Sequence, residues 1–325
     1  MLPLDRRSAP NWRAALAEIA PACQTQHVTL HAANLLLARG RLTEAEAAFR
    51  EFIARFPDQD AVLISFADLL RRTGRETEAE AVLRQAIHVE LDRLGCADDE
   101  RPLVESYIFA AERGQAPPAA SPPVFVAGLF DRFAGSFDAT LRERLQYRAP
   151  EVLFEAVTSE AGRELRDLDV LDLGCGTGLA GELFRPVARR LDGIDLSAGM
   201  IEQATTKNIY DRLVTGELVA FLATLDQAYD LILAADVFVY LGDLAPVFAA
   251  SRRSLRDTGR LAFTVELSDS PGYHLQPTRR FVHHRDYLHE TARSAGLDER
   301  LLDETWTRLQ EGRPVRSWVC VAGAS

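Results

Sequence analysis

The sequence predicts two parts of different fold class, an all-helical first part and an α/β second part. Three observations predict this division. Residues 1–113 have helical patterning and contain an internal repeat, residues 114–123 are rich in proline, and strand-like and helix-like segments alternate from Val124 onward in the 325-residue chain. Such alternation is typical of an α/β domain, and proline at that density favours an extended spacer. We therefore expect a helical domain at 1–113, a linker at 114–123 and an α/β domain at 124–325.

The helical part repeats itself with a fixed period. The segment GRLTEAEA, which begins at Gly40, returns as GRETEAEA from Gly74, an interval of 34 residues. This period resembles that of the tetratricopeptide repeat, as do the small and large apolar residues at matching positions, namely Ala33, Ala67, Ala45, Ala79, Phe49 and Leu83. The resemblance implies two stacked helical hairpins, with capping helices near residues 12–19 and 103–112. Such a domain either binds a peptide or partner protein or serves as a packing and self-association module.

Composition excludes several classes of function. A formal charge of -11 argues against the phosphate backbone of nucleic acids as a partner. No apolar run reaches the roughly 18 residues that span a membrane, and the N-terminus lacks the apolar core of a signal peptide. We expect a cytoplasmic protein, and the preference for Arg over Lys suggests a bacterial genome rich in GC. No metal site or disulfide framework is expected, because the cysteines are scattered at Cys23, Cys96, Cys175 and Cys320.

Within the second part, apolar segments predict the strands of a parallel sheet. The first, residues 169–173, runs directly into a glycine-rich segment, and a helix is expected to begin near Leu179. Nearly continuous apolar character is typical of parallel strands that are covered on both faces. Further strands are expected at 191–195, 229–235 and 260–266, with late strands at 306–309 and 317–322.

The spacing of the glycines distinguishes between two kinds of cofactor. Glycines occupy positions 174, 176 and 178, so the pattern is G-x-G-x-G. The dinucleotide fingerprint G-x-G-x-x-G needs glycine or alanine at position 179, where this chain has Leu179, which disfavours a nicotinamide oxidoreductase. With Asp172 in front, the segment resembles motif I of the class I S-adenosylmethionine-dependent methyltransferases. Glycine lets the backbone turn tightly and approach the cofactor closely.

This resemblance implies a Rossmann-like, seven-stranded sheet, with S-adenosylmethionine as cofactor and S-adenosylhomocysteine as product. Asp195, at the end of the second strand, would accept hydrogen bonds from the ribose hydroxyls. Leu196 and Met200 would pack against the adenine, although core packing is an equally good interpretation of Met200. Glu217 stands where many relatives have Asp. The residues expected to bind the cofactor are Asp172, Gly174, Cys175, Gly176, Gly178, Asp195, Leu196, Met200, Glu217, Leu218, Asp236 and Val237.

The acceptor side of the site is less explicit in the sequence. Residues 129–138 resemble the aromatic lid of small-molecule methyltransferases and contribute Phe130, Phe133 and Phe137, where relatives often have Tyr. The residues expected to face the substrate are Tyr240, Glu266 and His274, which we assign as catalytic candidates, together with Arg280 and His283. Arg280 would bind a carboxylate or phosphate of the substrate, or form an ordinary surface ion pair. Each histidine alone is equally well explained as a hydrogen-bonded loop residue.

The order of these parts is similar to that of the bacterial methyltransferases that carry tetratricopeptide repeats. We expect an enzyme that methylates the oxygen or nitrogen of a small-molecule or peptide-like acceptor. Two alternatives remain open at this point: a protein methyltransferase whose repeats dock the target, and a non-catalytic protein that binds S-adenosylmethionine or acts as a scaffold. The identity of the acceptor is not encoded in any motif of the sequence.

Overall fold

The computed structural model describes residues 12–19, 30–114, 116–162 and 164–324, and the chain divides into two compact units, 1–96 and 97–325. Each unit is described by itself below. None of the helices in the described ranges has both the length and the apolar character that a membrane span requires.

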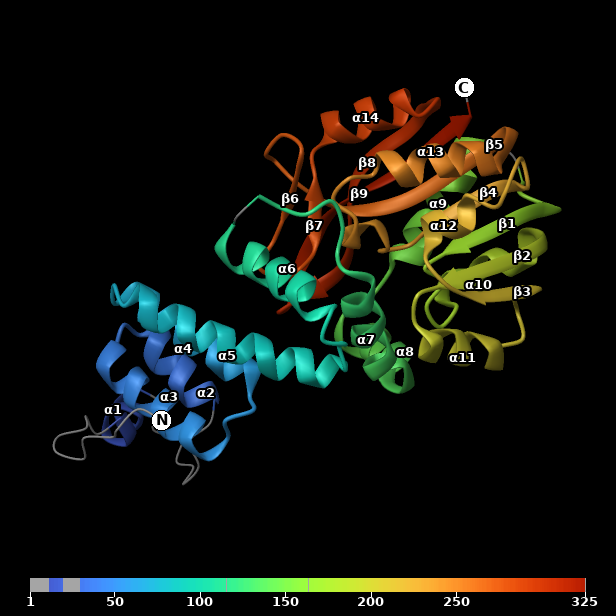
Figure 1. Ribbon diagram of the computed structural model, residues 1–325. Helices are drawn as coiled ribbons and strands as arrows, with labels where there is room; N and C mark the ends of the chain where they lie inside the picture. The colour runs from blue at the N-terminus through green and yellow to red at the C-terminus, as the bar shows by residue number, and fades with distance from the viewer. Residues whose placement is uncertain (1–11, 20–29, 115, 163, 325) are drawn as a thin grey trace. The chain divides into compact units, whose positions relative to one another are not determined.

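The described part of the first unit is built from helical hairpins (Figure 1). Gly40 and Gly74, with φ angles of 72° and 77°, end the first helix of each hairpin at matching places in the repeat. The six repeat positions named above are buried, each at 1% exposure or less. The helices are α1 (Trp12–Ile19), α2 (Leu30–Ala38), α3 (Leu42–Arg55), α4 (Asp60–Arg72) and α5 (Glu76–Leu94). The repeat period in the sequence is therefore a packing period in the structure.

The second unit is organised around one mixed sheet. Parallel strands run in the order β3-β2-β1-β4-β5, then β9 pairs antiparallel with β5 and β8 with β9. This part matches the expected seven-stranded sheet, and the hairpin β6–β7 adds two strands through a short parallel pairing of β7 with the end of β5. The strands are β1 (Leu168–Leu173), β2 (Ala188–Asp195), β3 (Arg212–Thr215), β4 (Tyr229–Ala234), β5 (Leu255–Leu267), β6 (Tyr273–Leu275), β7 (Phe281–His283), β8 (Leu297–Gln310) and β9 (Arg313–Ala324).

Helices cover both faces of this sheet (Figure 1). Successive residues of a strand point to opposite faces. In β1, accordingly, Val170 packs into the cluster beneath α9 and α10, and Leu171 into the cluster beneath α12, α13 and α14. The helices are α6 (Arg101–Arg113), α7 (Pro123–Phe133), α8 (Phe137–Ala139), α9 (Ala149–Ala161), α10 (Leu179–Phe184), α11 (Ala198–Thr206), α12 (Leu218–Leu222), α13 (Ala245–Ser254) and α14 (Arg285–Ser294), with short helical turns η1 (Ala134–Ser136), η2 (Thr140–Arg144), η3 (Arg185–Val187) and η4 (Phe238–Tyr240).

The segment expected as a linker is part of the second unit instead. The boundary between the units falls after Cys96, so α6 and the proline-rich residues belong to the second unit rather than to a domain that ends at 113. Proline lacks an N–H, but the residues between the prolines keep theirs. The N–H of Ser121 donates to the Tyr240 carbonyl at 2.9 Å, and the N–H of Gly242 donates to the Ala119 carbonyl at 2.8 Å. These hydrogen bonds fix the segment against the turn that follows β4.

Candidate active site

A cavity of about 350 Å³ lies at the carboxyl ends of β1, β2 and β4. Ligands in open α/β sheets bind at this edge, where the loops leave the strands. Most of the residues expected to bind a cofactor line it, including Asp172, Gly174, Cys175, Gly176, Asp195, Leu196, Glu217, Leu218, Asp236 and Val237. Phe130, Phe137, Tyr240 and Arg280 line the same cavity. One continuous space therefore adjoins both the glycine loop and the expected acceptor side.

The loop between β1 and α10 requires glycine for two separate reasons. A side chain at Gly174 would place its Cβ 2.5 Å from a methyl carbon of Val237, far inside van der Waals contact. Gly178, which precedes the first residue of α10, has a φ of 94°, a backbone conformation that side chains strongly disfavour. Gly178 does not itself line the cavity; its role is to form the turn that brings Gly174 and Gly176 to it.

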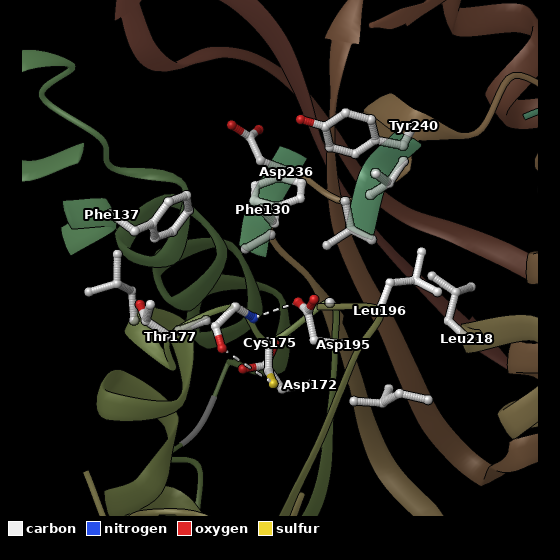
Figure 2. Close-up of a pocket in the computed structure, with 18 of the residues that line it drawn as sticks. Phe130, Phe137, Asp172, Cys175, Thr177, Asp195, Leu196, Leu218, Asp236 and Tyr240 are labelled. Carbon is white, nitrogen blue, oxygen red and sulfur yellow. Dashed lines mark hydrogen bonds between the residues drawn. The ribbon is translucent and has the colours of Figure 1, made fainter. Parts of the chain in front are cut away.

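Asp195 ends β2 with its carboxylate facing this loop (Figure 2). Its Oδ2 accepts from the Gly176 N–H at 2.9 Å, and its Oδ1 accepts from the Ser197 N–H at 2.8 Å. Burial raises the pKa of Asp195, against the effect of these two hydrogen bonds. A carboxylate has about four acceptor positions, so further positions remain for hydroxyl groups of a ligand in the cavity.

A second carboxyl group, that of Asp172, lies below the loop and is almost fully buried. Its Oδ2 accepts from the Tyr210 hydroxyl at 2.7 Å. Burial, with a contribution from the neighbouring carboxylate of Asp195, raises the pKa of Asp172 to about 7, against the effect of the hydrogen bond from Tyr210. The charge of Asp172 therefore changes near neutral pH, next to the loop expected to hold the cofactor.

The expected adenine end is formed by the segments after β2 and β3. Leu196 and Leu218 line the cavity with their apolar side chains (Figure 2). The carboxylate of Glu217 caps α12, accepting from the N–H groups of Val219 at 3.0 Å and of Ala220 at 2.6 Å. Each oxygen has one backbone partner, so acceptor positions remain on this carboxylate, which also lines the cavity. Met200 is completely buried in α11 and does not line the cavity, in agreement with its interpretation as a core residue.

Asp236 follows β4 in a backbone conformation that is unusual for a residue other than glycine, with a φ of 58°. Its N–H donates to the Thr264 hydroxyl at 2.9 Å, and that hydroxyl donates to the Asp236 carboxylate at 3.2 Å. These two hydrogen bonds fix the residue at the edge of the cavity. Strained backbone of this kind occurs where the surrounding structure over-determines it, often at functional sites.

Two arginines, Arg280 and Arg308, form a part of the cavity surface that we call the arginine wall. Both Arg280 and Arg308 line the cavity, and both contact the same oxygen of Glu266, at 3.4 Å and 2.5 Å respectively. Arg308 is nearly completely buried, and its Nε also lies 3.8 Å from the Asp236 carboxylate. The guanidinium of Arg280 lies 5.8 Å from the centre of the Tyr240 ring. Glu266 does not line the cavity itself, so its role is to hold the arginines.

The lid residues contribute aromatic rings. Phe130 packs edge-on against both Phe137 and Tyr240, with ring centres 5.9 Å and 5.6 Å apart, and the three rings border the cavity (Figure 2). Phe133 instead is 45% exposed and does not line the cavity. On a helix, a residue three positions from Phe130 shares its face only in part, and here Phe133 stands at the last residue of α7.

Polar contacts hold the lid to the expected cofactor-binding segments. Asp138 accepts from the Thr177 hydroxyl at 2.5 Å and from the Lys207 ammonium at 2.9 Å, and Lys207 also lies 2.8 Å from Glu182 of α10. Asp131 accepts from the Ser197 hydroxyl at 2.5 Å. The lid is therefore bonded both to the glycine loop and to the residue two positions after Asp195.

Neither histidine expected near the substrate reaches the cavity. His283 is completely buried in β7, where its Nε2 contacts the Gly242 carbonyl at 3.1 Å, and burial lowers its pKa to about 4. A neutral imidazole of this kind is a packed residue of the sheet. The Nε2 of His274 contacts the Pro271 carbonyl at 2.9 Å. Of the three catalytic candidates, Tyr240 alone lines the cavity, since Glu266 lies behind the arginines.

Tyr147 and Arg308, by contrast, line the cavity without having been expected there. The hydroxyl of Tyr147 donates a long hydrogen bond of 3.4 Å to the Ala235 carbonyl, and burial raises its pKa well above the ordinary value. Arg308 reaches the cavity because the pairing of β8 with β9 shifts register between Trp306 and Leu309. No motif surrounds either residue, so local sequence contains no signal for them.

Two family models match the chain. Residues 171–261 match a methyltransferase domain, and residues 36–93 match a tetratricopeptide repeat. Among known proteins, the human methyltransferase-like protein 27 is 39% identical over 85 residues, which is 26% of this chain and 34% of that protein. The malonyl-[acyl-carrier protein] O-methyltransferase of Serratia marcescens is 30% identical over 140 residues, which is 43% of this chain and 52% of that protein. The chain thus spans from about a third to about half the length of these curated relatives.

Among solved structures, the 1,6-didemethyltoxoflavin-N1-methyltransferase of Burkholderia thailandensis aligns with a TM-score of 0.48 and 21% identity, over 65% of this chain and 93% of that one. The matched domain begins within β1 and contains the glycine loop, Asp195 and Asp236. S-adenosylmethionine is the cofactor of this domain type. The chain therefore carries tetratricopeptide repeats in its first unit and a class I S-adenosylmethionine-dependent methyltransferase domain in its second.

Proposed function

We propose that the second unit transfers a methyl group from S-adenosylmethionine to an oxygen or nitrogen atom of a small-molecule or peptide-like acceptor. One observation carries the proposal: a single cavity joins the glycine loop and Asp195 to Tyr240 and the arginine wall. A cofactor held at the first group and an acceptor at the second would meet inside this cavity. Proximity and orientation of that kind can provide a large part of the catalytic effect.

The residues at the cofactor end fit S-adenosylmethionine. Asp195 keeps acceptor positions for the two ribose hydroxyls, and its burial makes an added donor favourable. Leu196 and Leu218 offer an apolar contact for the adenine. Asp172, when ionised, would lie near the positively charged amino group of the methionine part. We assign these residues to the cofactor, and assign Gly174 and Gly176 to the close approach of the backbone.

When bound, the cofactor supplies an activated methyl group, which an acceptor lone pair takes up while the carbon–sulfur bond breaks and its electron pair returns to sulfur. The chain itself has to exclude water and orient the acceptor. Phe130, Phe137 and Tyr240 enclose the cavity with aromatic rings, and the lid contacts of Asp138 hold them in place. A general base is required only for an acceptor that arrives protonated. Tyr240 is the residue that we place against the acceptor.

Two alternatives differ in their support. In a protein methyltransferase the repeats would dock the target, and the tetratricopeptide match is the observation in its favour. The relatives that are named malonyl-[acyl-carrier protein] O-methyltransferases favour an oxygen acceptor. The non-catalytic alternative is supported by Glu217, which stands where many relatives have Asp. Because the Glu217 carboxylate caps α12, this difference has a structural role and is weak support for a loss of catalysis. We therefore place the enzyme first.

Calorimetry with S-adenosylmethionine, S-adenosylhomocysteine and NAD tests the cofactor assignment. Both adenosyl ligands are expected to bind and NAD to show no heat. Asp195→Ala is expected to weaken binding, while Asp226→Ala, at an exposed position outside the cavity, serves as the matched control. Binding of NAD with no binding of either adenosyl ligand would overturn the proposal. Activity of a chain that begins at Ala97, compared with the full chain, then separates docking of a protein target from a self-sufficient site.

A further inference from the structure

Arg280 has more hydrogen-bonding capacity than its protein partners use. A guanidinium carries five N–H donors in a planar fork. Within the described part of the chain, the guanidinium of Arg280 makes one hydrogen bond, the long contact of 3.4 Å to Glu266, and the same oxygen is held more closely by Arg308 at 2.5 Å. The remaining donors of Arg280 face the cavity that this residue lines. The side chain is 26% exposed, so its open donors can be reached from the cavity, and this arrangement favours a ligand that accepts hydrogen bonds from a guanidinium.

The charges around the two arginines indicate the sign of that ligand. Arg280 and Arg308 contribute two positive charges, and Glu266 and Asp236 contribute two negative charges. A bound S-adenosylmethionine would add the single positive charge of its sulfonium. An acceptor with one negative charge would make the sum of these charges zero. A cationic amine would raise the sum to two positive charges, and a dianionic phosphate would leave one excess negative charge. Charges inside a protein cavity interact more strongly than in water, so this match in charge favours a monoanionic acceptor over the other two.

The surroundings indicate the rest of the ligand. The lid and the segments beside it contribute apolar side chains to the cavity wall, namely Pro123, Val126, Phe130, Leu141, Pro150 and Leu241. Apolar surface of this kind favours a hydrocarbon or aromatic body over a sugar or a highly polar one. The planar fork of arginine matches the two oxygens of a carboxylate geometrically.

We propose that Arg280, supported by Arg308 and Glu266, binds a carboxylate on an acceptor whose body is apolar. This inference rests on the proposed function for the identity of the site as an acceptor site. A carboxylate is deprotonated at neutral pH. If one of its oxygens is the atom that is methylated, the reaction needs no general base. Within the described ranges, the residues that line the cavity include no histidine, which is consistent with this chemistry.

The backbone holds Arg280 in place from both sides. Its neighbour Arg279 has a φ of 60°, and the Arg279 carbonyl accepts from the Tyr107 hydroxyl at 2.5 Å. The same hydroxyl accepts from Ser121, another cavity residue, at 2.9 Å. The N–H of Gln276 donates to the Arg280 carbonyl at 2.9 Å. The backbone of Arg280 is therefore fixed before a ligand arrives, which lowers the entropic cost of binding.

Calorimetry with three probes of one chain length tests the assignment: hexanoate, its neutral analogue hexanamide, and hexyl phosphate. With the full chain saturated with S-adenosylmethionine, which carries the sulfonium charge, hexanoate is expected to bind at least about tenfold more tightly than hexanamide and more tightly than hexyl phosphate. Arg280→Met is expected to bring hexanoate and hexanamide within about twofold of each other. Arg313→Met removes an exposed arginine outside the cavity and should leave the preference unchanged.

Equal binding of hexanoate and hexanamide, a preference that survives Arg280→Met, or a preference for hexyl phosphate would each overturn the inference. Arg280→Lys guards against misfolding, because it keeps the charge and loses the fork, and it should show an intermediate preference. Unchanged affinity for S-adenosylhomocysteine certifies each variant as folded at the cofactor end. If the wild-type protein fails to bind S-adenosylhomocysteine, the proposed function fails, and the comparison of hexanoate with hexanamide on the free protein still decides the carboxylate site.

Discussion

The raised pKa of Asp172 predicts that the second unit loses stability as the pH increases toward neutrality. The carboxyl group is almost fully buried, and its pKa rises from the ordinary 3.8 to about 7. Between these two values the folded protein holds a proton that the unfolded chain has released. The free energy of unfolding therefore falls as the pH rises through this window and levels off above pH 7. The whole difference corresponds to about 4 kcal/mol, and the part between pH 5 and pH 8 to about 2 to 3 kcal/mol.

Asp172→Asn isolates this effect, because the amide keeps the shape and does not titrate. At pH 5 the variant is expected to be more stable than the wild type by about 1 to 2 kcal/mol, and at pH 8 by about 4 kcal/mol, so the difference grows by about 2 to 3 kcal/mol over this range. Urea unfolding, followed by the fluorescence of Trp306 and Trp318 in the second unit, measures the difference. A Trp12→Phe background removes the signal of the first unit. Asp226→Asn, at an exposed position, is the control.

A difference between Asp172→Asn and wild type that stays constant from pH 5 to pH 8 would refute the reasoning, since it would mean that the buried carboxyl group keeps its ordinary pKa. The same titration bears on the cofactor. Above pH 7 the ionised carboxylate favours a cationic ligand in the cavity, so S-adenosylmethionine should bind more tightly at pH 8 than at pH 6 in the wild type. In Asp172→Asn this dependence should be weaker.

Three further outcomes are expected. Asp195→Ala should weaken S-adenosylhomocysteine binding by about 1 to 3 kcal/mol in calorimetry, and unchanged affinity would remove Asp195 from the ribose site. Tyr107→Phe loses two hydrogen bonds and should lower the free energy of unfolding in urea by about 1 to 3 kcal/mol. Hexanoate should bind more weakly to this variant, and S-adenosylhomocysteine should bind with unchanged affinity. Weaker binding of both ligands would contradict a role confined to the acceptor end. Lys207→Met removes the ion pairs to Asp138 and Glu182, so S-adenosylhomocysteine should dissociate about two- to fivefold faster in stopped flow, with less dependence on salt.

The cofactor end was predictable because its determinants are contiguous. The residues from Asp172 to Gly178 form one strand–turn–helix unit, in which Gly174, Gly176 and Gly178 all have positive φ angles. Asp195 lies at the end of the strand paired with β1, so its place follows from the order of the strands. At these positions, the residues that are close in space are also close in the sequence or at the ends of paired strands, so a sequence motif is enough to predict them.

The acceptor end was predictable only in part. Tyr240 and Arg280 were expected there and line the cavity, whereas Arg308 was missed, because pairing between distant segments places it. Thr307 and Arg308 are consecutive in β8, and a regular strand would turn one of them away from the interior. The register shift between Trp306 and Leu309 buries both, and the Thr307 carbonyl accepts from the N–H of Arg148 at 2.8 Å. A β-bulge that redirects a side chain in this way cannot be recognised from the composition of the strand.

The extent of the domain match explains why relatives inform on the methyl donor and not on the acceptor. The matched residues, 171–261, end within β5 and include the glycine loop and Asp195. Arg280 and Arg308 lie beyond that range, and Tyr107 lies before it. Two proteins can therefore share the donor end of this cavity and differ at the positions of Arg280 and Arg308. The chemistry of the acceptor therefore has to be inferred from Arg280 and Arg308 of this protein. The preference for hexanoate over hexanamide is the measurement that tests this inference.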